Sequence, residues 1–158
     1  MESVSIDNDS LAVDLPEGFY VVSLEHVQYL YGIDYVCMWG TRDDERHMVV
    51  NCIWKDSGNL ITKLMSEKSL AKNAEKTLAK RYTNYQYACK GFFETTVAGT
   101  AARGFRYFYE CDGVGQDCEA IVFKHGKRCY TLYYYTRPEL ADENRPVYEE
   151  ILASLTLK

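Results

Sequence analysis

Residues 129–136 read CYTLYYYT, and residues 144–157 read NRPVYEEILASLTL. The first segment alternates, which puts Tyr130, Leu132 and Tyr134 on one face of a strand and Cys129, Thr131, Tyr133 and Tyr135 on the other. In the second segment apolar residues recur every three or four positions, which predicts a helix over Asp142–Leu155. Pro146 would sit in its first turn, with Asp142 or Asn144 as the cap. A strand followed by a closing helix therefore decides the fold.

The other segments predict more strands around one long helix. Alternating or apolar runs bounded by turn residues indicate strands at residues 11–15, 34–40, 47–54, 91–99, 104–111, 118–123 and 128–136. Residues 60–82 have the helical period instead, with Ser57 or Asn59 as a cap and Asn84 near the end. Because consecutive strands joined by short turns pair antiparallel, we expect an α+β fold with helices packed on a twisted antiparallel sheet of about six to seven strands.

Length and charge limit the class of protein. The chain has 158 residues and a net charge of −5, which predicts one domain (residues 1–158) and argues against nucleic acid as a partner. The basic residues Lys72, Lys76, Lys80 and Arg81 are interleaved with glutamates, as on a solvated helix face. No apolar stretch reaches the roughly 18 residues of a transmembrane helix. The N-terminus lacks a signal-peptide pattern, so we expect a cytoplasmic protein, or an exported or lipid-anchored one if a signal segment has been removed.

Both ends of the chain resemble the PsbP-like superfamily. The resemblance lies in Gly126, Lys127, Arg128, Tyr130, Thr131, Leu132 and Tyr134, then in Arg145, Pro146, Tyr148, Ile151, Leu152 and Ser154, and in LAVDLPEGF at residues 11–19. It implies an α/β/α sandwich around an antiparallel sheet. It also implies binding, scaffolding or chaperone-like roles, including adaptor roles in some bacterial members, and no shared catalytic motif. Arg145 and Pro146 are expected to be architectural, with Arg145 anchoring the preceding loop.

Six cysteines raise the question of a disulfide. None forms a C-x-x-C motif or zinc-finger spacing, and most lie in apolar runs, where a free thiol behaves as a small hydrophobe. Cys111 and Cys118 are the exception, because they flank the turn at residues 112–117. If that turn closes symmetrically, the two thiols face each other across adjacent strands and a disulfide becomes feasible in an oxidising compartment.

Motifs for metal binding and catalysis are missing. The three histidines are far apart in the sequence, and the acidic residues at 43–45 and 7–9 indicate solvated loops rather than a metal site. No serine lies in a nucleophile elbow, and Cys89 beside Lys90 fits strand packing better than catalysis. We therefore expect no catalytic residues, no cofactor and no metal.

The 14 tyrosines are the remaining candidate site. A tyrosine joins a large apolar ring to a polar tip, which suits both sheet positions and partner surfaces. We expect Tyr133 and Tyr135, with Tyr107 and Tyr109 on neighbouring strands, to face a protein or peptide partner, and a homodimer stays open. The alternatives are a small-ligand or carbohydrate-binding module on the same tyrosines, or an enzyme whose site the sequence does not reveal.

Overall fold

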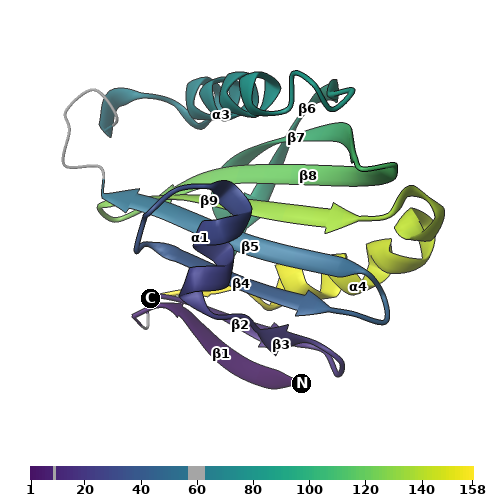
Figure 1. The fold of residues 1–158 in the computed structure, drawn as a ribbon. Helices are drawn as coiled ribbons and strands as arrows, with labels where there is room; N and C mark the ends of the chain where they lie inside the picture. The colour runs from purple at the N-terminus through teal and green to yellow at the C-terminus, as the bar shows by residue number, and fades with distance from the viewer. Residues whose placement is uncertain (9, 57–62) are drawn as a thin grey trace.

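A seven-stranded sheet forms the centre of the computed structural model, which describes residues 1–8, 10–56 and 63–158 (Figure 1). All neighbouring strands are antiparallel, in the order β3-β4-β5-β9-β8-β7-β6. The strands are β3 (Tyr20–Val21), β4 (Met38–Asp43), β5 (Met48–Asp56), β6 (Ala88–Val97), β7 (Thr100–Cys111), β8 (Val114–His125) and β9 (Arg128–Thr136). The expected antiparallel sheet of six to seven strands is confirmed.

The two chain ends pair in a separate, smaller sheet. It contains β1 (Glu2–Asp7), β2 (Leu11–Leu15) and β10 (Thr156–Leu157), in the order β1-β2-β10. The strand predicted at residues 11–15 is therefore present, but it pairs with β1 and β10 rather than with the large sheet. Its alternation still decides its packing, because Leu11, Val13 and Leu15 all point into the core.

Helices cover both faces of the large sheet. On one face lie α1 (Leu24–Tyr31) and α3 (Glu67–Arg81), and on the other lies α4 (Ala141–Ser154), preceded by the 3-10 helix η1 (Pro138–Leu140). Each face has its own hydrophobic cluster, one including Val27, Ala71 and Leu78, the other Tyr148 and Ile151. The α/β/α arrangement is thus confirmed. In the part of the chain that the structure describes, no helix is both long and apolar enough to span a membrane.

The sequence pattern did not predict the helix α1. It has only eight residues, too few for a periodic pattern to stand out. Its ends do have ordinary signals: the Ser23 side chain accepts from the His26 N–H, and Gly32 closes the helix at φ 63°. For α3, the predicted caps Ser57 and Asn59 lie outside the described residues, and Ser66 caps the helix by accepting from the Ser69 N–H at 3.2 Å.

The closing helix α4 has nearly the expected bounds, but its start is built differently. Neither Asp142 nor Asn144 is the cap, because η1 runs directly into α4 through Leu140. Asn144 is instead buried, and its amide donates to the Arg46 carbonyl at 2.8 Å and to the Thr136 hydroxyl at 2.9 Å. Pro146 lies inside the helix rather than in its first turn. Arg145 reaches Glu119 on β8 at 2.9 Å and does not anchor the preceding loop.

The disulfide between Cys111 and Cys118, which the sequence left as a possibility, is not formed. The β7–β8 hairpin turns at Asp112 and Gly113, both with positive φ (52° and 79°), the geometry of a tight two-residue turn. Cys111 therefore lies opposite Val114, and Cys118 lies opposite Tyr107, four residues further along the ladder. All six thiols are free.

Candidate functional site

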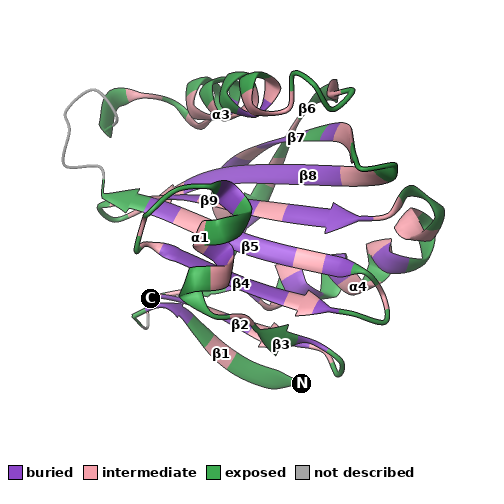
Figure 2. Ribbon diagram, in the orientation of Figure 1, coloured by how far each residue is buried: buried purple, intermediate pink, exposed green. Residues whose placement is uncertain are grey.

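An apolar groove lies between α1 and α3 on one face of the large sheet. The helix α1 packs mainly on β4, while α3 packs mainly on β7 and β8, so the strands β5 and β9 between them are covered only in part. Ile53 of β5 and Thr131 and Tyr133 of β9 consequently stay half-buried in the middle of the sheet. The groove has a volume of about 400 Å³. The groove exists because α1 and α3 lie apart on the sheet. Figure 2 shows that much of α3 is also exposed to solvent.

The exposed lining of the groove is mostly apolar. Leu70, Ala74 and Leu78 project from α3, and Val122 lies below them on β8. At the α1 side the wall includes Ile33, a large apolar side chain that is 45% exposed. The aliphatic side chains of the walls and the exposed Ile33 at the rim leave apolar area in contact with water, which a bound partner would remove.

The charges on the groove have one sign. The charged side chains that line it are Lys55 and Arg81, in a chain whose net charge is −5. The Arg81 guanidinium donates to the Leu30 carbonyl at 2.6 Å and lies over the Tyr31 ring, 5.1 Å from its centroid. Arg81 therefore joins the C-terminal ends of α1 and α3 and fixes a positive charge at the rim.

A network of tyrosines closes one end of the groove. The hydroxyls of Tyr31 and Tyr135 are 2.8 Å apart, and the Asn51 amide donates to Tyr31 at 3.0 Å. Burial raises the pKa of both tyrosines well above the usual value, so their hydroxyls are neutral hydrogen-bonding groups. The rings of Tyr82 and Tyr109 stack on each other beside them, with their centroids 4.1 Å apart. A smaller cavity of about 170 Å³ lies among these rings.

The four predicted tyrosines belong to this face but differ in exposure. Tyr133 lines the groove and Tyr109 lines the smaller cavity, each half-buried. Tyr135 is 8% exposed and Tyr107 only 1%, so both are core residues under the helices, and the expectation of an open tyrosine surface is wrong for them. The sequence missed Ile33 and Arg81, because nothing in the pattern placed α1 beside the end of α3.

Among residues 1–8, 10–56 and 63–158, no three His, Cys, Asp or Glu side chains lie together as metal ligands would. Asp43, from the acidic loop, accepts from the Glu45 and Arg46 N–H groups at 3.0 Å each and pairs with the Arg46 side chain. These contacts hold the β4–β5 turn in place.

Known structures share this fold at low sequence identity. No protein-family model and no curated protein sequence matches the chain. The cyanobacterial PsbP of Synechocystis sp. PCC 6803 superposes with a TM-score of 0.73 at 16% identity, covering 99% of this chain and 92% of that one. The Saccharomyces cerevisiae Ran-binding protein Mog1p gives 0.66 at 6% identity (99% and 94% covered). LpqN of Mycobacterium tuberculosis, involved in cell envelope biogenesis, gives 0.63 at 11% identity (99% and 90% covered).

Proposed function

From a PsbP-like fold and an apolar groove open between two helices, we propose that this protein is a non-catalytic module that binds a protein segment in the α1–α3 groove. The observation that carries the proposal is the half-buried floor of Ile53, Thr131 and Tyr133 in the middle of the sheet. One protein of the same fold is a Ran-binding protein, which supports a binding role for this kind of scaffold.

The chemistry of the groove defines the partner. Its exposed lining is mostly apolar and its charged rim residues, Lys55 and Arg81, are both basic. The segment it fits has apolar side chains that enter the groove and an acidic side chain on the edge that meets the rim. The acidic group gives direction and specificity, while apolar burial supplies most of the affinity.

The groove favours a peptide over a small ligand. A cavity that encloses a drug-sized ligand measures roughly 300–1,000 Å³ and buries most of that ligand. The cavity among the tyrosines is only about 170 Å³, too small for a sugar ring with its hydroxyls. The groove, at about 400 Å³, is within the range of small-ligand sites, and its exposed apolar rim at Ile33 supports a peptide segment that extends beyond it. Carbohydrate binding through the tyrosines is therefore the second candidate, and an enzyme the third. The free thiols support a reducing compartment, and we propose the cytoplasm.

A selection from a random peptide library displayed on phage tests the proposal. We expect the selected peptides to combine two or more large apolar residues with an Asp or Glu. Ile33→Glu puts a charge in the groove wall and should weaken these peptides about tenfold or more, whereas Val36→Glu, at a 70% exposed apolar residue outside the groove, should not.

The basic rim has its own matched pair of variants. Lys55→Gln should weaken binding about two- to fivefold, as loss of an exposed ion pair does, and Lys72→Gln on the outer face of α3 should have no effect. Equal losses for Ile33→Glu and Val36→Glu, or no enriched peptide, would refute the groove as the site. A groove occupied by a second copy would appear as a dimer that Ile33→Glu dissociates.

A further inference from the structure

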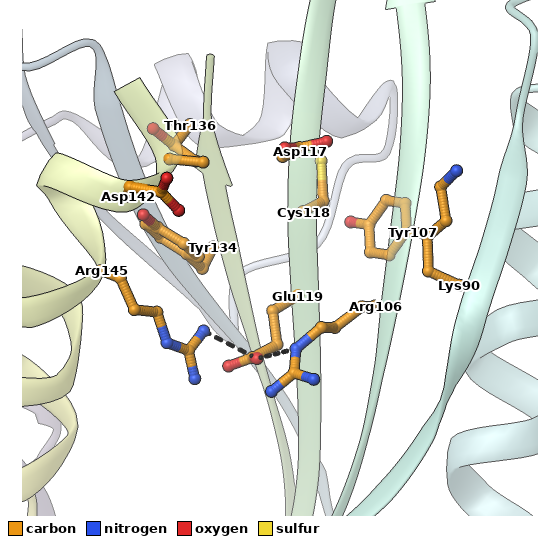
Figure 3. A pocket seen from close by; sticks show the side chains of 11 residues that line it. Lys90, Arg106, Tyr107, Asp117, Cys118, Glu119, Tyr134, Thr136, Asp142 and Arg145 are labelled. Carbon is orange, nitrogen blue, oxygen red and sulfur yellow. Dashed lines mark hydrogen bonds and ion pairs between the residues drawn. The ribbon is translucent and has the colours of Figure 1, made fainter. Parts of the chain in front are cut away.

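A second pocket, of different chemistry, lies on the opposite face of the sheet. It has a volume of about 580 Å³ and opens beside α4, over β7 and β8. Figure 3 shows Arg106 and Arg145 pointing toward Glu119 from opposite sides, one from β7 and one from α4. This pocket and the α1–α3 groove have no charged lining residue in common.

A buried carboxylate orients the two arginines. Glu119 is 2% exposed, and its Oε1 accepts from Arg145 Nη1 at 2.9 Å and from Arg106 Nε at 3.2 Å. The Arg106 guanidinium also lies over the Phe93 ring, 4.7 Å from its centroid. Within the described chain only Nε of Arg106 is engaged, so both of its terminal amino groups are free for a ligand, as is Nη2 of Arg145. Such fixed guanidinium edges suit a carboxylate.

The pocket places its two aspartates away from its two arginines. Asp117, Asp142 and Thr136 lie at the end away from the arginines, and Lys90 on β6 lies at the level of Asp117 rather than with the arginines (Figure 3). Asp117 and Glu119 are two residues apart on one face of β8, which is about 7 Å along a strand. The unpaired acceptors of Asp117 and Asp142 suit an ammonium group.

Three side chains that line this pocket, those of Tyr107, Glu119 and Tyr134, have a buried polar atom with unfilled hydrogen-bonding capacity. The Tyr134 hydroxyl and Glu119 Oε2 are buried and make no hydrogen bond of normal geometry within the described residues, although Thr136 lies beside the first and Tyr148 beside the second. Tyr134 is only 4% exposed and lines the pocket. A ligand that carries a hydrogen-bonding group would satisfy the Tyr134 hydroxyl at the pocket wall.

We propose that this pocket binds a zwitterion of dipeptide length. The ligand carboxylate lies on the free edges of Arg106 and Arg145, and its ammonium group lies between Asp117 and Asp142. An extended dipeptide spans roughly 7 Å, which is similar to the backbone spacing of Asp117 and Glu119 along β8. The Tyr134 hydroxyl is then available to the peptide group between them.

Titration of the full chain with three related probes tests this proposal. The probes are glycylglycine, N-acetylglycylglycine and glycylglycine amide. Binding of each is monitored by NMR of the backbone amides and of the arginine Nε–Hε groups. We expect glycylglycine to shift the signals of Arg106, Asp117, Glu119 and Arg145 in a saturable manner. Each blocked probe should bind at least about tenfold more weakly, because each lacks one charge-assisted contact.

Matched variants separate the pocket from general charge effects. Arg106→Gln and Asp142→Asn should each weaken glycylglycine about tenfold, while Arg103→Gln on the other face of β7 and Glu143→Gln beside the pocket should not. Absence of saturable shifts would overturn the proposal. So would equal binding of the acetylated probe, which would leave a simple anion site, or equal losses in the variants and their controls.

Discussion

Replacing Arg145 with methionine probes how α4 is held on the sheet. The arginine donates to the buried Glu119 at 2.9 Å, lies over the Tyr148 ring at 5.4 Å and pairs with Glu149 at 3.1 Å. A hydrogen bond to a charged group contributes about 1.5–3 kcal/mol. The cation–π contact adds about 0.5 kcal/mol. The surface pair adds only about 0.3 kcal/mol. Because Arg106 still neutralises Glu119, we expect Arg145→Met to lower the free energy of unfolding by about 2–3 kcal/mol.

Urea unfolding measures this loss through the buried tryptophans, Trp39 and Trp54. With a slope of about 2 kcal/mol/M, the midpoint should fall by about 1–1.5 M. Arg103→Met is the control, since Arg103 pairs only with the exposed Glu94 and should cost less than about 1 kcal/mol.

The effect of Glu119→Gln on stability, compared with and without Arg145, is the sharper part of the test. In the unmodified protein Glu119→Gln removes a paired carboxylate and should destabilise the fold by about 1 kcal/mol. After Arg145→Met only the 3.2 Å contact with Arg106 still neutralises Glu119, so the same change should cost less stability than it does in the unmodified protein. If Glu119→Gln destabilises both backgrounds equally, the account of Glu119 as a carboxylate that depends on Arg145 is refuted.

Three further predictions concern thiols, pH and packing. Ellman's reagent should modify the exposed Cys89 and Cys111 in the native protein but reach Cys52 and Cys118 only on unfolding, because burial raises the pKa of both buried thiols; rapid reaction of Cys52 would contradict this. Burial raises the pKa of Tyr31, Tyr107 and Tyr135 above the ordinary value of about 10, so their stabilising effect is complete below about pH 10 and is lost as the pH rises further. Tyrosinate absorbance and circular dichroism should therefore change together at alkaline pH, and ionisation of these residues without unfolding would be the opposing result. Gly40→Ala should cost about 1–3 kcal/mol in thermal unfolding, since the added Cβ would lie 2.8 Å from Val27 Cγ2 and against the buried Asn51 side chain; an unchanged melting temperature would show that α1 can shift freely.

The fold could be predicted from the sequence wherever a periodic pattern ran for several residues. The alternation in β9 and the helical stripe of α4 assigned both elements, and Tyr130, Leu132 and Tyr134 are core residues as their positions in the resembling family indicated. Charged residues misled the prediction locally. The strand β4 extends to Asp43, which looked like part of a polar loop, because backbone N–H groups and Arg46 satisfy that buried carboxylate.

The site was harder to predict than the fold because it depends on the spacing between helices. Alternation correctly put Tyr133 and Tyr135 on one face of β9, but only the position of α1 decides that Tyr135 is buried and Tyr133 lines a groove. The pairing of Arg106 with Glu119 follows from strand register, which depends on the two-residue turn at Asp112 and Gly113. A symmetric turn around residues 112–117 would have placed other residues opposite one another.

The groove as the binding site is tested most directly by mapping a selected acidic, apolar peptide on the protein by NMR. Shifts are predicted for Ile33, Ile53, Leu70 and Tyr133, with saturation at a single affinity. The pocket of Arg106 and Glu119 on the opposite face should be unaffected. Shifts confined to that pocket or to the β6 edge, with an unperturbed groove, would contradict the proposed function.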